Sequence, residues 1–238
     1  MIGPLNISAI EKSLLRVKQE FQTINQSLAD KRDPLSYEVV NHMVDGYRAL
    51  NDYFVAGLNP FELGQSSSML ELNQIVLCGY NEQMILSLRE QLRQNGKTGT
   101  DEPLLAVDSM DDRYMRASCG YFYSDDGCLR EMMEWFDINH NKSVWFQAAG
   151  LLGQILSHPQ LFVEGNHRTA TLLMSYLLVS QGKPPCVLTP EAAIFYFEHA
   201  SDLKKKYKGR IDTRLQLPRL AEQFADWLAT NCNDAFLL

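Results

Sequence analysis

The sequence predicts an all-α fold with one small β-hairpin insertion, and three observations predict it. Apolar residues recur three and four positions apart along most of the chain, which is the spacing of one face of an α-helix. Residues that favour helix ends, such as Ser, Asn, Gly and Pro, separate these segments. The exception is the stretch 96–127, where Gly, Thr and Asp are frequent and the helical spacing is lost.

Four helices are expected in the first 95 residues, each from apolar spacing combined with a start or stop signal. They are a helix over residues 10–24, one capped by Asp33 with Pro34 at its first position and ending near Gly57, one from the serines 66–68 through Leu77, and one over residues 81–93.

The predicted hairpin lies between residues 96 and 127. Tyr121, Phe122 and Tyr123 are followed by Ser-Asp-Asp-Gly, which has the composition of a strand entering a turn. Helical spacing resumes after it. The expected helices cover residues 128–136, 143–157 and 166–180, a segment beginning at Pro190, and a last one over residues 218–229.

We interpret residues 1–95 as an N-terminal helical part and residues 96–238 as the main core. A chain of 238 residues, 45% of them hydrophobic, is long enough to bury one substantial core with an appended helical part. The sequence contains no internal repeat and no low-complexity linker that would argue for a different division.

The charge of the chain argues against nucleic acid as a partner. The net charge is −7 and the pI about 5.3, and an acidic protein repels a phosphate backbone. The basic run of Lys204, Lys205 and Lys206, continued by Lys208 and Arg210, is the one local exception. We interpret this run as the solvated end of a helix.

Cysteine usage and the absence of long apolar runs predict a cytoplasmic protein without a membrane span. The five cysteines are scattered and form no Cys-x-x-Cys pair, which suits a reducing compartment. No apolar run approaches the ~18 residues that a membrane helix needs, and the N-terminus has no basic and apolar signal-peptide pattern. Delivery as a secreted effector by a route without a cleaved signal stays open.

The segment 148–174 carries the residues with the clearest chemistry. Two apolar helices are joined by a connection that concentrates polar side chains. These side chains are His158, Glu164, Asn166, His167 and Arg168. A connection between two buried helices is usually short and bland, so this composition indicates a functional site.

The chemistry of these residues indicates a site that binds phosphate. Gly165 allows a close approach of the backbone to a ligand, and the first amides of the following helix form an anion site. Arg168 presents a planar fork to phosphate oxygens. Glu164 offers a hard oxygen for Mg²⁺, which prefers a carboxylate together with substrate phosphates. His158 can accept a proton near neutral pH. Together these groups predict phosphoryl or nucleotidyl transfer.

His158-Pro159, Phe162, Glu164-Gly165-Asn166 and Arg168 resemble the motif of the Fic (Fido) family, His-Pro-Phe-x-Asp/Glu-Gly-Asn-Gly-Arg-x-x-Arg. The resemblance extends over residues 128–185 and implies a Fic-like helical bundle. It further implies transfer of AMP, or another phosphate-containing group, from ATP or another nucleotide to a Ser, Thr or Tyr hydroxyl of a target protein. In that family's scheme His158 is the general base and Glu164 holds Mg²⁺. The anion cradle is formed with contributions from Gly165, Asn166 and His167, and Arg168 binds phosphate.

The motif departs from the family pattern at three places. Gln160 and Leu161 are additional residues between Pro159 and Phe162, and we expect them to bulge from the loop. His167 stands where the family has Gly, and Thr171 stands for the last Arg, which binds the distal phosphate in the family. An alignment without a gap would place Gln160 at the catalytic position. The departures keep a different donor, such as another nucleotide or a phosphocholine carrier, open.

A second, upstream segment resembles the family's inhibitory helix, Ser/Thr-x-x-x-Glu-Gly-Asn. It runs from Ser67 to Glu71 and Asn73, with Leu72 in place of Gly. The resemblance implies that Glu71 obstructs the distal-phosphate site. The other interpretation is a capping box, in which Ser68 caps the helix and Glu71 reaches back to it.

Two functions therefore follow from the sequence. The first is a Fic-type nucleotidyltransferase that acts on protein hydroxyls with Mg²⁺ and a nucleotide donor. The second is a catalytically weak or inactive Fic-like module that binds a nucleotide or anion.

Overall fold

The computed structural model describes residues 5–62, 64–77, 118–124 and 129–238. Helices make up most of these residues, and an all-α fold is confirmed. In chain order the elements are α1 (Ile7–Ser27), α2 (Tyr37–Ala56), α3 (Ser67–Val76), α6 (Leu129–Ile138), α7 (Val144–Leu156), α8 (Asn166–Ser180), α9 (Pro190–Lys204), α10 (Ile211–Asn231) and the short 3₁₀ turn η1 (Asp234–Phe236).

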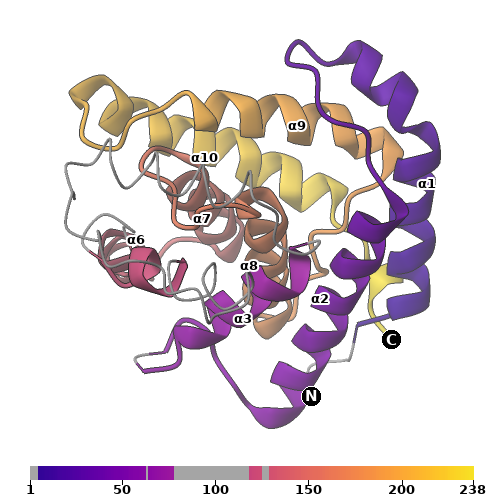
Figure 1. Cartoon of the computed structure of the whole chain (residues 1–238). Coiled ribbons are helices and arrows are strands. Elements are labelled where there is room, and N and C mark those ends of the chain that lie inside the picture. The colour runs from indigo at the N-terminus through magenta and orange to yellow at the C-terminus, as the bar shows by residue number, and fades with distance from the viewer. Residues whose placement is uncertain (1–4, 63, 78–117, 125–128) are drawn as a thin grey trace, which may run out of the picture.

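The centre of the fold is the packed pair α7 and α8 (Figure 1). Both helices are buried around most of their circumference, because other helices enclose them on several sides. α10 and α6 pack against α7, while α2 and α3 pack against α8. α1 packs on both α2 and α9. One hydrophobic core contains buried residues from all of these helices, so the described residues on either side of position 95 share it.

Several predicted helix ends are confirmed by their caps. Ser143 caps α7, accepting from the amide of Phe146, and Thr189 caps α9, with Pro190 at its first position. Gly57 ends α2 in the left-handed conformation, with φ of 67°. Each of these residues satisfies backbone groups that a helix end leaves unpaired.

Two helix starts were predicted incorrectly. α2 is capped by the Ser36 hydroxyl, which accepts from the amide of Val39, and not by Asp33. The last helix begins at Ile211, with Pro218 inside it. Its first turns carry the exposed apolar residues Ile211 and Leu215. Most residues before Pro218 in this helix are exposed, so this part of the sequence lacks the apolar spacing of a buried helix face.

The predicted hairpin is also wrong where the structure describes it. Residues 118–122 form a helical turn, and Tyr121 and Phe122 are buried. Phe122 stacks on Phe162 with ring centroids 5.4 Å apart, so tertiary packing of these aromatic rings outweighs their preference for a strand. The rest of the predicted hairpin and the helix expected over residues 81–93 lie outside the described residues. Within the described part of the chain, no helix has the length and apolarity needed to cross a membrane.

Candidate phosphate-handling site

The connection between α7 and α8 is held by its own side chains. Asn166, the first residue of α8, is buried and turned back into the loop. Its Oδ1 accepts from the Phe162 amide at 2.9 Å, and its Nδ2 donates to the Phe162 carbonyl at 2.7 Å. Nδ2 also contacts Gln160 Oε1 at 3.3 Å. Only the backbone of Asn166 therefore remains available to a ligand, while its side chain fixes the loop.

The two additional residues of the motif do not bulge outward as expected. Leu161 is fully buried, and its amide donates to the Ile155 carbonyl at 3.2 Å. Gln160 donates from Nε2 to the Leu156 carbonyl at 3.1 Å. Both residues thus satisfy carbonyls at the end of α7, and Gln160 has a structural position in the loop.

His158 is anchored to the connection between α9 and α10 through its backbone. Its amide donates to the Lys206 carbonyl at 2.7 Å, and its carbonyl accepts from the Lys208 amide at 2.9 Å. Its ring stacks on Tyr207 with centroids 5.0 Å apart. Burial lowers the pKa of His158, and the charges of Lys204 and Lys208 lower it further. The imidazole is therefore neutral near pH 7, as a general base must be.

Gly165 precedes α8 in the left-handed conformation, with φ of 75°. A Cβ at this position would lie 2.9 Å from Asn73 Nδ2 and 3.1 Å from a Leu77 methyl group. Glycine is therefore required both by the backbone angle and by the close approach of α3. Its amide donates to the carboxylate of Glu164 at 3.2 Å, and that carboxylate is exposed.

We expect Gly165→Ala to lower the free energy of unfolding by about 1–3 kcal/mol and to displace α3. Gly182, which follows α8, is the matched control, because its φ is 68° and a Cβ there would meet nothing within 4 Å. Chemical denaturation of both variants separates the backbone strain from the clash. Equal losses for Gly165→Ala and Gly182→Ala would show that α3 does not press on the loop.

α3 lies against the start of α8 and makes polar contacts with it. Asn73 Nδ2 donates to the Glu164 carbonyl at 2.8 Å and to Thr169 Oγ1 at 2.9 Å. The guanidinium of Arg168 donates to the Val76 carbonyl at the end of α3. The residue of the upstream motif that reaches the loop is thus Asn73, and the resemblance to the inhibitory helix implied no role for it.

The two other motif residues of α3 point elsewhere. Glu71 accepts from the Tyr53 hydroxyl at 2.6 Å, and burial together with this carboxylate raises the pKa of Tyr53. Ser67 is exposed at the first position of the helix. The capping box is wrong, because Ser68 lies inside the helix and its hydroxyl donates to the Gln65 carbonyl at 2.6 Å.

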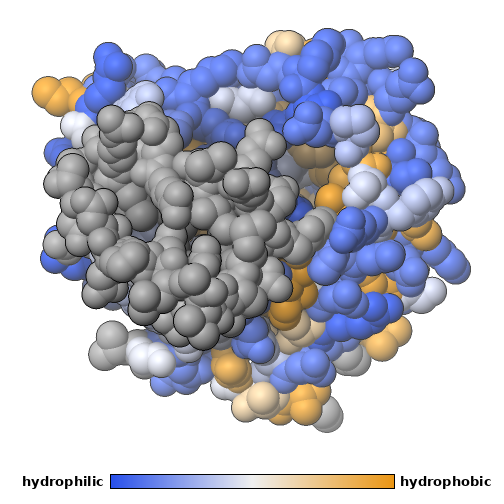
Figure 2. Space-filling model, viewed as in Figure 1, coloured by the Kyte–Doolittle hydropathy of each residue, from blue (hydrophilic) through white to orange (hydrophobic). Residues whose placement is uncertain are grey.

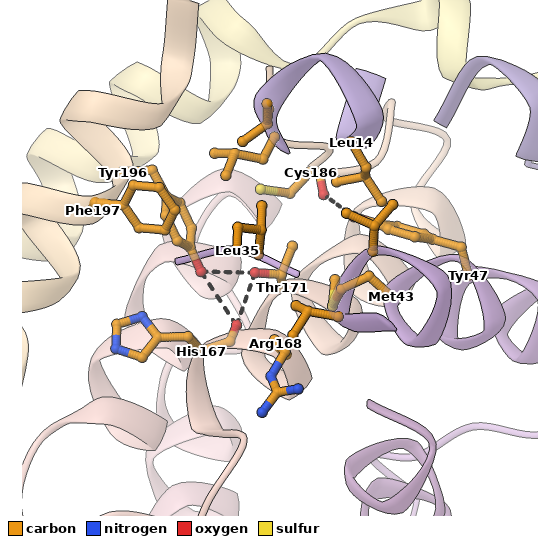
Figure 3. A pocket seen from close by; sticks show the side chains of 14 residues that line it. Leu14, Leu35, Met43, Tyr47, His167, Arg168, Thr171, Cys186, Tyr196 and Phe197 are labelled. Atoms are coloured by element: carbon orange, nitrogen blue, oxygen red, sulfur yellow. Dashed lines mark hydrogen bonds between the residues drawn. The ribbon is translucent and has the colours of Figure 1, made fainter. Parts of the chain in front are cut away.

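The position of the missing arginine is part of the core. Thr171 Oγ1 donates to the His167 carbonyl at 2.9 Å and lies 2.7 Å from the Tyr196 hydroxyl. That hydroxyl also donates to the His167 carbonyl at 3.3 Å, which closes the triangle drawn in Figure 3. Thr171 therefore packs with α9 and presents no charge to a ligand.

A mainly apolar cavity of about 110 Å³ lies beside this triangle, between α1, α2, α8 and α9. Phe197 and Tyr196 form one wall and Met43 and Tyr47 another (Figure 3). In Figure 2, hydrophobic residues are visible among hydrophilic ones between α2 and α9. Of the predicted site residues, His167 and Arg168 line this cavity, whereas His158 and Glu164 do not.

The residues that could hold Mg²⁺ are few. Among the described residues, no three His, Cys, Asp or Glu side chains are grouped as a metal site. Mg²⁺ needs only one or two carboxylates when substrate phosphates supply further oxygens. The exposed carboxylate of Glu164 at the start of α8 suits an ion that arrives with a nucleotide, and it does not suit a permanently bound metal.

Positive charges act on two histidines, His158 in the connection and His167 in the first turn of α8. Burial lowers the pKa of His167 to about 3, and Arg32, Lys204 and Arg168 contribute to the shift. Lys204 also acts on His158. The basic run at residues 204–208 was interpreted as a solvated helix end, yet Lys208 is buried and donates from Nζ to the Pro159 carbonyl at 2.8 Å. Nothing in the sequence singled out Arg32.

Comparisons with protein-family models, with curated proteins and with solved structures find no match to this chain.

Proposed function

We propose that this chain binds the phosphates of a nucleotide at the start of α8 and transfers AMP, or another phosphate-containing group, to a hydroxyl of a target protein. The observation that carries the proposal is the composition of one fixed loop. A neutral imidazole at His158 and a left-handed Gly165 occur within it, and the cationic Arg168 follows in the first turn of the buried helix α8. The Fic-type resemblance of the same residues supports this assignment.

The proposed reaction divides the work among these groups. The target hydroxyl gives its proton to His158, and its oxygen attacks the α-phosphorus of the nucleotide. The bond from that phosphorus to the bridging oxygen breaks, and pyrophosphate leaves. Arg168 and the first amides of α8 bind the phosphate oxygens. Glu164 would hold Mg²⁺, which neutralises phosphate charge when it is bound.

α3 would oppose this reaction in the arrangement seen here. The guanidinium of Arg168 is engaged by the Val76 carbonyl, and Asn73 covers Gly165. A nucleotide would have to compete for Arg168. We therefore propose that α3, which carries Ser67 and Glu71, restrains the site, and that it does so through Asn73.

A second candidate function is binding without turnover. The observation in its favour is the core position of Thr171, whose hydroxyl is satisfied by His167 and Tyr196 and carries no charge for a distal phosphate. A module of this kind would keep the anion site and lack efficient transfer.

Labelled nucleotides distinguish the two candidates. The full chain is incubated with Mg²⁺ and, in turn, with ATP, GTP, CTP or UTP labelled at the α-phosphate, and with labelled CDP-choline. Incorporation of label into the chain or into an added protein extract supports the transferase. Nucleotide binding measured by calorimetry, without incorporation from any donor, supports the binding module. Absence of both would contradict both candidates.

We expect Arg168→Ala to weaken nucleotide binding at least tenfold, about 1.4 kcal/mol. A charge-assisted contact to phosphate is lost in this variant. Titration calorimetry measures the affinity, and thermal denaturation reports the accompanying loss of the contact to Val76. Arg48→Ala is the matched control, because Arg48 is exposed and forms a surface ion pair with Asp45. Unchanged affinity of a folded Arg168→Ala variant would exclude this residue from the phosphate site.

A further inference from the structure

Within the described part of the chain, the imidazole of His167 has no hydrogen-bond partner. Both ring nitrogens are buried, and neither finds a donor or acceptor among the described residues. A neutral imidazole carries one N–H donor and one acceptor, and burying such groups without partners is unfavourable. The ring extends away from the hydrogen-bonded Thr171 and towards the side on which Phe197 lies (Figure 3). The carbonyl of His167, in contrast, is fully engaged.

Arg32 presents a second unpaired buried donor near this place. The residue lies in the connection between α1 and α2, and its guanidinium carbon is 4.6 Å from the centroid of the Phe197 ring. Nη2 donates to the Phe197 carbonyl and to the Ser201 hydroxyl, at 2.9 and 3.0 Å. Its Nε is buried and has no partner among the described residues. No carboxylate within the described part of the chain forms an ion pair with it.

The Arg32 guanidinium and the His167 imidazole are connected through Phe197. Phe197, on which Arg32 lies, lines the same cavity as His167. The neighbouring Tyr196 donates to the His167 carbonyl at 3.3 Å. The charge of Arg32 contributes to the low pKa of His167, second only to burial, and Lys204 at the end of α9 also contributes. Unsatisfied donors and positive charge therefore occur together, with Asp30 and Glu198 offsetting only part of the charge of Arg32.

Donors and positive charge without an acceptor indicate an oxyanion as the missing partner. A guanidinium binds phosphate oxygens with several N–H groups, and a neutral imidazole adds one more N–H. We propose that Arg32 and His167 form a phosphate-binding subsite next to the start of α8. Arg32 supplies there the charge that Thr171 lacks. The assignment of this phosphate to the distal part of a nucleotide rests on the proposed function, whereas the subsite itself does not.

Calorimetry on the full chain tests the subsite with pyrophosphate, AMP, ADP and ATP as probes. We expect pyrophosphate to bind, and ATP and ADP to bind more tightly than AMP. Arg32→Gln should weaken pyrophosphate and ATP at least tenfold, as expected for a charged contact, and should leave AMP unchanged. Arg48→Gln, an exposed arginine on α2, is the control and should change none of these affinities.

A second variant is needed because Arg32 also ties its connection to α9 and Arg32→Gln could unfold. His167→Phe keeps an aromatic ring and removes both nitrogens, and it should weaken pyrophosphate binding as well. The ¹⁵N resonances of the His167 ring, followed by NMR during a pyrophosphate titration, should shift in the wild-type chain.

Wild-type affinity for pyrophosphate in both variants, or no pyrophosphate binding by the wild-type chain, would overturn the subsite. Pyrophosphate binding that depends on Arg32 without label transfer from any donor would uphold the subsite and contradict the transferase. ATP binding and transfer that do not depend on Arg32 would contradict the subsite and support the transferase.

Discussion

Replacing His158 with alanine is expected to lower the rate of transfer by about 10²–10⁴-fold, the usual contribution of a general base, while nucleotide affinity stays nearly unchanged. The reason is the separation of roles within the loop. The ring of His158 stacks on Tyr207, whereas its backbone makes the bonds that hold the loop to the α9–α10 connection. Alanine keeps those backbone bonds. Single-turnover labelling and calorimetry measure the two effects separately.

The pH profile of the wild-type reaction adds an independent test of His158. Burial and two lysines lower its pKa below the ordinary value of 6.5. A base acts in its deprotonated form, so the rate should fall only as the pH drops through this lowered pKa. Gln160→Ala is the control variant. A reaction that survives His158→Ala but is lost in Gln160→Ala would move the catalytic position to residue 160 and contradict our alignment.

Asn166→Ala is expected to lower the free energy of unfolding by about 2–4 kcal/mol, because it leaves the buried amide and carbonyl of Phe162 unpaired and such groups cost about 1–3 kcal/mol each. Phosphate binding should weaken in parallel, since the loop before α8 loses its internal clamp. Urea denaturation measures the first effect and calorimetry the second.

Asn231→Ala is the matched control for this change. The Asn231 amide also donates to a backbone carbonyl, that of Trp227 at 2.8 Å, but the bond is exposed, so water replaces it and the loss should be small. Similar losses in the two variants would mean that the Asn166 bonds contribute no more than a surface contact.

Local patterns in the sequence predicted much of the fold. Apolar spacing located α7, α8 and α9, and α7 and α9 also carry their own start signals in the caps Ser143 and Thr189. The failures arose where tertiary packing outweighs local preference. Phe122 is helical because it stacks on Phe162, and Pro218 is inside α10. Neither arrangement has a signal within a few residues of sequence.

The candidate site likewise contains residues that the local sequence predicted and residues that only the tertiary fold brings to it. The loop residues His158, Gly165 and Asn166 lie close together in the sequence, so one motif contains all three. Asn73 and Arg32 reach the site only because α3 and the α1–α2 connection fold onto α8 and α9. Asn73 is 91 positions from Glu164, and Arg32 is 165 positions from Phe197. Contacts at such sequence separations cannot be predicted from the spacing of residues along the chain. Arg32 is identified as a candidate binding residue only by its buried Nε, which has no hydrogen-bond partner among the described residues.

The pair of main-chain bonds between His158 and the α9–α10 connection has a consequence for sequence variation. The connection is clamped by amides and carbonyls, which every residue except proline carries in full. Residue 206 can therefore change freely in charge and size without moving His158, while position 208 must keep an N–H and excludes proline. Substitution of the exposed Lys204, whose charge acts on His158, would alter the potential at the imidazole and leave these main-chain bonds unchanged. The electrostatics of this site can thus be tuned by substitution independently of its geometry.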